Sequence, residues 1–192
     1  MTPVDIQPRP LFYAERLHPR RPETIDLVVI HCTELPDLET ARRYGERIHH
    51  PHSQTGNCGH YYLDRDGEIQ EWVPPLRIAH HVRGFNERSI GVELVNRGRY
   101  PDWFDSRHQQ MTEAYPQQQI KALAALLRHL TRGLPALRWI CGHEQLDTQW
   151  VAASDRKSLR VRRKRDPGPL FPWPMLLSAS PLTPFPGCPP GG

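Results

Sequence analysis

Short runs of apolar, β-forming residues alternate along the chain with longer amphipathic stretches. The most apolar run covers residues 26–32 and reaches His31 near its end. Runs of this length that are rich in Val and Ile are typical of buried strands. We expect further strands at 78–81, 89–95 and 138–142, each of which combines apolar residues with a few polar positions.

Two stretches, 37–50 and 117–130, carry apolar residues at helical spacing. Asp37 stands in an N-cap position for the first stretch, and Pro116 stands directly before the second, where a helix commonly begins. An Asp-Gly pair between two β-forming runs predicts a hairpin over 60–73. Strands and helices in this mixed order predict one α/β or α+β domain built around a single sheet.

The length of 192 residues suits one well-buried domain with tails. Proline occurs 21 times, about twice its usual share, and the excess gathers near both ends. The sequence therefore predicts a Pro-rich N-terminal arm over 1–22, a folded domain over 23–175 and a flexible Pro/Gly-rich tail over 176–192. Both ends are expected to be poorly ordered.

Two polar stretches lack regular periodicity. Residues 99–114 are typical of a long surface loop. Residues 144–165 are expected to form a mobile rim, because about twenty polar residues exceed what a compact connection requires. The formal net charge of +4 is uneven, since seven Lys or Arg lie between Arg156 and Arg165. Such a run is usually a solvated loop, but it can also attract an acidic substrate, nucleic acid or an anionic membrane.

No apolar run approaches the roughly 20 residues that a membrane span requires, and the N-terminus lacks the apolar core of a signal peptide. A cytoplasmic location is therefore the expectation, and the sequence indicates no oligomeric state. The cysteines form no CxxC pair, so Cys32, Cys58 and Cys141 are expected to be small buried residues. Cys141 lies two residues before His143, on the same face of a strand, and is an alternative metal ligand.

Two histidines and one aspartate stand at the ends of predicted elements. His31 and His143 each end a short apolar run, and Asp166 precedes a rigid Pro-Gly turn. Two imidazoles and one carboxylate can form an open zinc site in which the fourth position is left for water. Taken singly, each is an ordinary structural residue, and the histidine-rich stretch 49–52 is interpreted as a helix stop rather than as a second metal cluster.

Five collinear motifs surround these residues, and over roughly residues 20–175 the chain resembles the zinc-dependent N-acetylmuramoyl-L-alanine amidases. That family includes AmpD-like amidases, phage lysozyme-type amidases and peptidoglycan recognition proteins. The most specific matches are Val29-Ile30-His31, Ser89-Ile90-Gly91-Val92-Glu93 and Lys164-Arg165-Asp166-Pro167-Gly168-Pro169. The resemblance implies a central mixed β-sheet flanked by helices.

The resemblance also implies a zinc ion held by His31, His143 and Asp166. It implies Glu93 as the base that moves a proton and Lys164 as the cation that holds the oxyanion. Hydrolysis of an amide needs a metal, a base and an oxyanion partner, because an amide has a poor leaving group. Two alternatives stay open from the residues alone: Glu93 can be the partner in a salt bridge, and Lys164 can be solvated surface.

The implied substrate is the bond between the lactyl group of N-acetylmuramic acid and the L-alanine of the stem peptide. This bond occurs in intact peptidoglycan and in the muropeptide fragments of cell-wall turnover and recycling. Stem peptides are anionic, which suits a basic rim. His81 and Asn86 match motif positions near the substrate groove, but either can instead stabilise the connecting turn.

The chain departs from the family pattern at several positions. Cys32 follows the first ligand where Asn is usual, and His80 replaces a frequent Trp. The segment joining the second and third ligands is longer than usual. Gly59 stands where the phage and recognition-protein branches carry a catalytic Tyr, which favours Glu93 as the base.

Two other functions compete with the enzyme. A catalytically inactive peptidoglycan-binding module can keep the same fold, although the presence of all three ligand types argues against it. A nucleic-acid binder can use the basic run, but that run lacks interleaved aromatics and no nucleic-acid motif accompanies it. The sequence therefore predicts a hydrolase without a nucleic-acid partner.

Overall fold

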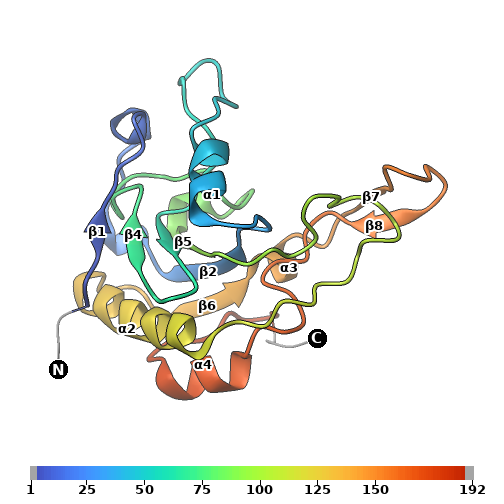
Figure 1. Cartoon of the computed structure of the whole chain (residues 1–192). Helices are drawn as coiled ribbons and strands as arrows, with labels where there is room; N and C mark the ends of the chain where they lie inside the picture. The colour runs from blue at the N-terminus through green and yellow to red at the C-terminus, as the bar shows by residue number, and fades with distance from the viewer. Residues whose placement is uncertain (1–3, 189–192) are drawn as a thin grey trace.

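The computed structural model describes residues 4–188 of the chain, and within them one mixed sheet forms the centre of the molecule, with helices on both sides (Figure 1). Its strands, in spatial order, are β1 (Gln7–Pro8), β4 (Ile69–Glu71), β3 (Tyr61–Leu63), β5 (Ser89–Leu94), β2 (Leu27–Cys32), β6 (Trp139–Gly142) and β9 (Thr183–Pro184). β3 and β4 are antiparallel, and the other neighbouring pairs are parallel. The prediction of a single α/β domain with a central mixed sheet is confirmed.

The middle of the sheet is β2, which pairs in parallel with β5 on one side and β6 on the other. All six of its residues are buried. Val28 and Ile30 belong to the main core cluster on one face, whereas Leu27 and Val29 pack in a smaller cluster on the other. A parallel strand covered on both faces is apolar at successive positions, which explains the continuous apolar run in the sequence.

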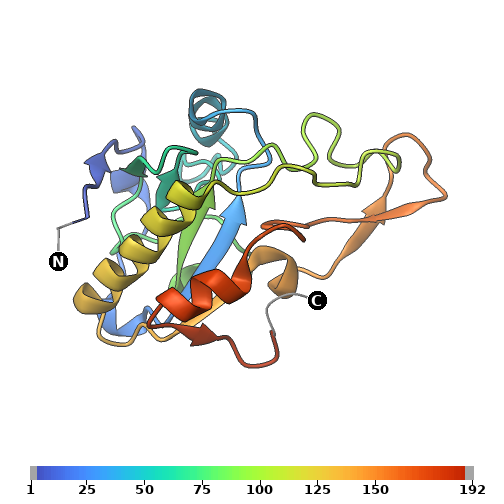
Figure 2. The same cartoon turned by 60° about the horizontal axis from the view of Figure 1, so that its bottom comes forward.

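Helices α2 (Gln117–Gly133) and α4 (Trp173–Ala179) cover one face of the sheet (Figure 2). The apolar stripe of α2 places Ile120 and Leu123 in the main core cluster. Helix α1 (Leu38–Gly45) lies on the opposite side of the sheet (Figure 1). The remaining helical segments are the 3-10 helices Ala14–Arg16, Pro22–Thr24 and Asn86–Arg88 and the short helix α3 (His143–Leu146).

The predicted helices and hairpin are present, with shorter bounds for the first helix. Asp37 caps α1, because its carboxylate accepts a hydrogen bond from the backbone N–H of Thr40 at 2.6 Å. The helix ends at Gly45, so the histidine-rich stretch 49–52 lies in the turn that follows. β3 and β4 form the predicted hairpin, whose connecting turn contains Gly67 at a φ of +92°. Glycine adopts this left-handed conformation without steric cost.

The strand predicted at 78–81 is wrong. This segment joins none of the strands in the described part of the chain. The backbone N–H of His81 bonds instead to the side chain of Asn86. Ala79 is buried in a core cluster, so the apolar character of the segment comes from packing and not from strand pairing.

The prediction of a poorly ordered N-terminal arm is also wrong. β1 adds an edge strand to the sheet, and Leu11, Tyr13 and Leu17 are buried. The Tyr13 hydroxyl donates a hydrogen bond to the carbonyl of Gly45 at 2.5 Å, which joins the arm to α1. Burial of apolar side chains between the prolines offsets the entropy lost when the arm is ordered. Residues 1–3 lie outside the described part of the chain.

The flexible tail predicted for 176–192 is wrong where the structure describes it. Helix α4 continues to Ala179, and β9 then pairs in parallel with β6. Leu176 and Leu182 are buried, so packing fixes this segment as it fixes the N-terminal arm. Residues 189–192, with the last prolines and glycines, lie outside the described residues.

Residues 144–165 form structure that the sequence did not predict. β7 (Trp150–Ala152) and β8 (Arg160–Arg162) pair as an antiparallel hairpin that projects from the body of the molecule (Figures 1 and 2). The lack of regular elements expected for this segment is therefore wrong, whereas its mobility as a rim stays a prediction. We call residues 149–163 the β-arm. The β-arm lies beside the segment that joins β5 to α2. Within the described residues that segment contains no helix or strand, as predicted for the loop 99–114.

Candidate metal centre and active site

Three side chains from distant parts of the chain meet at one edge of the sheet. His31 lies near the end of β2, and His143 follows β6 as the first residue of α3. β2 and β6 are neighbouring parallel strands, so their carboxyl ends open at the same edge. Asp166 reaches this edge from the segment that follows the β-arm. The structure thus brings together the three residues predicted as metal ligands.

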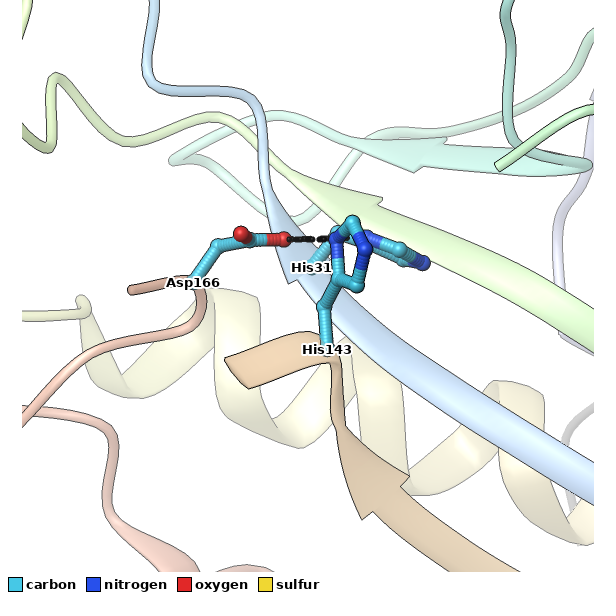
Figure 3. A group of neighbouring side chains, drawn as sticks. All are labelled: His31, His143 and Asp166. Carbon is cyan, nitrogen blue, oxygen red and sulfur yellow. Dashed lines mark hydrogen bonds and ion pairs between the residues drawn. The ribbon is translucent and has the colours of Figure 1, made fainter. Parts of the chain in front are cut away.

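The three side chains converge on one oxygen atom (Figure 3). Oδ2 of Asp166 lies 2.9 Å from Nδ1 of His31 and 2.9 Å from Nδ1 of His143. All three residues are buried, and Oδ1 of Asp166 has no hydrogen-bond partner among residues 4–188. The three ligand atoms lie within 4.8 Å of one another. A buried carboxylate with a spare oxygen beside two imidazole nitrogens fits a metal cation.

Burial and charge set protonation states that suit a metal. The pKa of His31 is lowered to about 4, first by burial and then by the charge of His143. Burial opposes ionisation of Asp166, but its interactions with His143 and His31 outweigh burial and hold the Asp166 pKa well below its usual value. At neutral pH His31 is therefore neutral and Asp166 is ionised, which are the forms that coordinate metal ions.

Glu93 stands next to this cluster. It is the register partner of His31 in the β2–β5 pair, so both side chains leave the same face of the sheet. Its Oε1 lies 3.9 Å from Nδ1 of His31, and burial followed by the charge of Asp166 raises the Glu93 pKa to about 8. Gly59 makes room for the carboxylate, because a Cβ at position 59 would lie 2.8 Å from Cγ of Glu93. A side chain at position 59 would therefore clash with Glu93 in its observed position.

The cluster opens into a cleft of about 330 Å³. Glu93 and Lys164 line this cleft together with the three candidate ligands. The charge of Lys164 acts on Glu93, where it opposes the rise in pKa that burial and Asp166 cause. Lys164 therefore belongs to the lining of the cleft and is not merely part of the solvated basic run.

His81 and Asn86, the two predicted substrate-binding residues, occupy different places. His81 lines the cleft, and its Nδ1 lies 3.0 Å from Nε2 of His31. Gly91 admits the His81 ring, because a Cβ at that position would lie 2.6 Å from ring atoms. Asn86 lies outside the lining, and its Oδ1 accepts hydrogen bonds from the backbone N–H groups of His81 and Val82. Asn86 thus stabilises the turn that positions His81.

Cys141 is not a member of the ligand cluster. Its side chain packs with Leu27 and Val29 in an apolar cluster of the core. His143 lies beyond β6, in α3, so the alternation of a strand does not relate the two residues. The stretch 49–52 likewise contributes nothing to the metal-site group identified among the described residues.

A buried ion pair in the lining of the cleft was not predicted from the sequence. The side chains of Glu34 and Arg99 are 9% and 1% exposed, and two hydrogen bonds of 2.7 and 2.9 Å join them. Arg99 also donates to the carbonyls of Arg162 and Arg163, which ties the end of β2 to the segment leading to Asp166. The sequence contains one trace of this pair, an acidic residue just after a buried strand. Its partner lies in an irregular loop, where no periodicity marks it.

A mixed sheet with two imidazoles and a carboxylate at its edge, and a second carboxylate beside them, suits a metal-dependent hydrolase. A family model described as N-acetylmuramoyl-L-alanine amidase matches residues 21–169 of the chain. The chain belongs to the N-acetylmuramoyl-L-alanine amidase family.

Individual relatives agree with this assignment. The chain is 33% identical over 116 residues to N-acetylmuramoyl-L-alanine amidase AmiD of Escherichia coli (strain K12). This match covers 56% of this chain and 36% of that protein. It is 32% identical over 123 residues to 1,6-anhydro-N-acetylmuramyl-L-alanine amidase AmpD of Salmonella typhimurium (strain SL1344). This match covers 60% of this chain and 52% of that protein. The chain thus matches about half or less of the length of these relatives.

The fold also agrees with solved structures. The endolysin N-acetylmuramoyl-L-alanine amidase LysCS from Clostridium intestinale URNW matches with a TM-score of 0.65 at 20% identity. The match covers 95% of this chain and 99% of that chain. At this level of identity the likeness establishes the fold alone.

Proposed function

We propose that the protein is a zinc-dependent amidase that hydrolyses the bond between the lactyl group of N-acetylmuramic acid and the L-alanine of the stem peptide. The observation that carries the proposal is the placement of Glu93 and Lys164 in one cleft with the buried His31, His143 and Asp166. Both curated relatives are named as amidases of muramyl-L-alanine, one of them for the 1,6-anhydro form. A role in cell-wall turnover or recycling follows from that substrate.

His31, His143 and Asp166 are the residues that would hold the zinc ion. Zinc binds neutral imidazole nitrogen and carboxylate oxygen, and catalytic sites use three protein ligands. When bound, zinc polarises the scissile carbonyl and activates water for attack near neutral pH. The unpartnered Oδ1 of Asp166 and the neutral state of His31 support this ligand set.

Glu93 is the group that moves the proton. Its carboxylate faces the same cleft as the ligands, and its pKa of about 8 is close enough to neutrality for proton uptake and release. A cation beside Asp166 would offset the charge that contributes to this raised pKa, which favours the ionised, basic form of Glu93. Glu93 then takes a proton from the attacking water and returns it to the departing amine of L-alanine.

Lys164 supplies positive charge to the cleft. An ammonium group beside the reacting carbonyl stabilises the oxyanion that develops when water adds to the amide. Arg163 lines the same cleft, and with Lys164 it provides a basic rim that suits anionic stem peptides. His81 stands beside His31 on the lining and is the residue that we expect to contact the substrate next to the ligands.

The location of the protein in the cell stays a prediction. The sequence favours the cytoplasm and no nucleic-acid partner. Within residues 4–188, every helix is too short or too polar to cross a bilayer.

Incubation of the purified protein with a soluble anhydro-muropeptide and with insoluble peptidoglycan tests the proposal, with mass spectrometry of the products. We expect release of the peptide that begins with L-alanine from at least one substrate. A zinc chelator should abolish the release, and added Zn²⁺ should restore it. A zinc-loaded protein that cleaves neither substrate would instead be the inactive peptidoglycan-binding module.

A further inference from the structure

The β-arm has two unlike faces. In its ladder Val151 pairs with Val161. The flanking pairs are Trp150 with Arg162 and Ala152 with Arg160. Paired residues leave the same face of a two-stranded sheet, and successive residues leave opposite faces, so the valines share one face and the flanking pairs share the other. Val161 is 4% exposed and Trp150 is 54% exposed, so the valine face is covered and the tryptophan face is open to solvent.

Contacts with the neighbouring segment hold the β-arm in place. The backbone N–H of Ser154 donates to the carbonyl of Phe104. The carboxylate of Asp155 accepts hydrogen bonds from the backbone N–H and the hydroxyl of Ser106, both at 2.7 Å. The exposed face is therefore presented by an anchored hairpin, and the acidic group of its turn is already engaged by Ser106.

Positive charge gathers on the exposed face and at the turn. Arg156, Lys157 and Arg160 are all exposed. In residues 4–188 none of the three forms a salt bridge with a carboxylate. The exposed face and the turn thus carry three cations without a salt bridge, of which Arg160 donates a hydrogen bond to the carbonyl of Trp150. The face also carries one exposed indole, whose flat apolar surface is suited to contact with a partner.

The β-arm connects directly to one wall of the cleft. Arg163 and Lys164, which follow β8, line the cleft, and so do Trp103 and Phe104 of the neighbouring segment. The cleft volume of about 330 Å³ lies near the lower end of the range of about 300–1,000 Å³ found for small-molecule sites. A polymer with one amide bond in this cleft extends beyond the cleft, and the β-arm offers one surface next to the cleft wall that Arg163 and Lys164 form.

We propose that the exposed face of the β-arm is a second binding surface, outside the cleft, for the anionic stem peptides of polymeric peptidoglycan. This inference rests on the proposed amidase function and narrows its substrate class to the polymer in preference to single soluble fragments. Carboxylates of neighbouring stem peptides complement Arg156, Lys157 and Arg160. A lipid surface fits less well, because Trp150 lies at the end of the ladder away from the cationic turn, and Leu159 is the single large apolar side chain that the turn, residues 153–159, exposes.

The experiment compares the full-length wild type with the triple variant Arg156→Ser/Lys157→Ser/Arg160→Ser. A matched control removes the same number of charges from exposed positions on other elements, by Arg9→Ser, Arg21→Ser and Lys121→Ser. Affinity for insoluble peptidoglycan is measured by cosedimentation at several salt concentrations. kcat/KM is measured on a soluble anhydro-muropeptide.

The triple variant should lose about ten-fold in affinity for the polymer, because exposed ion pairs are individually weak and three are removed. Its remaining affinity should depend less on salt. Its kcat/KM on the soluble fragment should match the wild type, since none of the three residues lines the cleft. The control triple should bind the polymer as the wild type does.

A second variant guards against a folding defect. Arg156→Ser/Lys157→Ser leaves the hydrogen bond from Arg160 to the Trp150 carbonyl intact and should show an intermediate loss of polymer affinity. Equal losses on polymer and soluble substrate, or equal losses in the control triple, would overturn the second surface. The second surface would also be overturned if the triple variant bound the polymer as the wild type does but no longer cosedimented with phosphatidylglycerol vesicles. A wild type that binds the polymer through the arm but cleaves nothing would refute the amidase function alone.

Discussion

Arg99→Met should destabilise the fold strongly, because it breaks a buried ion pair. Methionine keeps the apolar stem of the side chain but removes the guanidinium, which donates to Glu34 at 2.7 and 2.9 Å. It also removes the 2.9 Å hydrogen bond to the carbonyl of Arg162. The Glu34 carboxylate would then be buried without its partner.

Removing one partner of a buried ion pair costs about 3–5 kcal/mol. In a protein of this size each 1 kcal/mol lowers Tm by about 2–4 °C, so the Tm of Arg99→Met should fall by about 6–20 °C. Calorimetry or circular dichroism measures the fall. Arg43→Met is the matched control, because the Arg43 and Glu39 side chains of that ion pair are 60% and 82% exposed. Exposed pairs contribute little, so the control should hardly change Tm.

The double variant Glu34→Gln/Arg99→Met separates charge from packing. It removes both charges, so it should recover part of the stability lost in Arg99→Met. A Tm for Arg99→Met equal to that of Arg43→Met would refute the reasoning. A double variant less stable than Arg99→Met would place the cost in lost packing and not in an unpaired carboxylate.

Three further predictions follow from other sites. Gly59→Ala should displace Glu93 and lower kcat by about ten-fold or more at unchanged zinc content, whereas Gly133→Ala, which has open space, should keep kcat. Equal kcat in both variants would contradict the packing of Glu93 over position 59. Tyr13→Phe loses a buried hydrogen bond worth about 0.5–1.5 kcal/mol, so Tm should fall by about 1–6 °C, and no fall would count against an ordered N-terminal arm. A thiol reagent should modify Cys188 but not the three buried cysteines of the native protein, and mass spectrometry of labelled peptides checks this.

The sequence predicted those parts of the fold that depend on local pattern. The apolar run that became β2 and the stripe that became α2 are visible because burial repeats with the period of each element. The placement of His31 and Glu93 as register partners also agrees with the sequence, since both stand near the ends of predicted strands.

Parts that depend on contacts between distant residues were not predictable in this way. Glu34 and Arg99 are 65 residues apart, and neither stands in a periodic stretch. The strand pair of the β-arm was hidden because each strand is only three residues long, too short for a periodic pattern, and β8 carries two arginines. The N-terminal arm was misjudged because its proline content outweighed the few apolar residues that the fold buries.

The most direct test of the central claim combines zinc analysis with kinetics for Glu93→Gln. The amide keeps the shape of the side chain but cannot accept the proton, so kcat should fall by about 10²- to 10⁴-fold. Zinc content should equal that of the wild type, because His31, His143 and Asp166 are unchanged, whereas His31→Ala should lose the metal. A folded, zinc-loaded Glu93→Gln protein with wild-type turnover would contradict the assignment of Glu93 as the base of a zinc amidase.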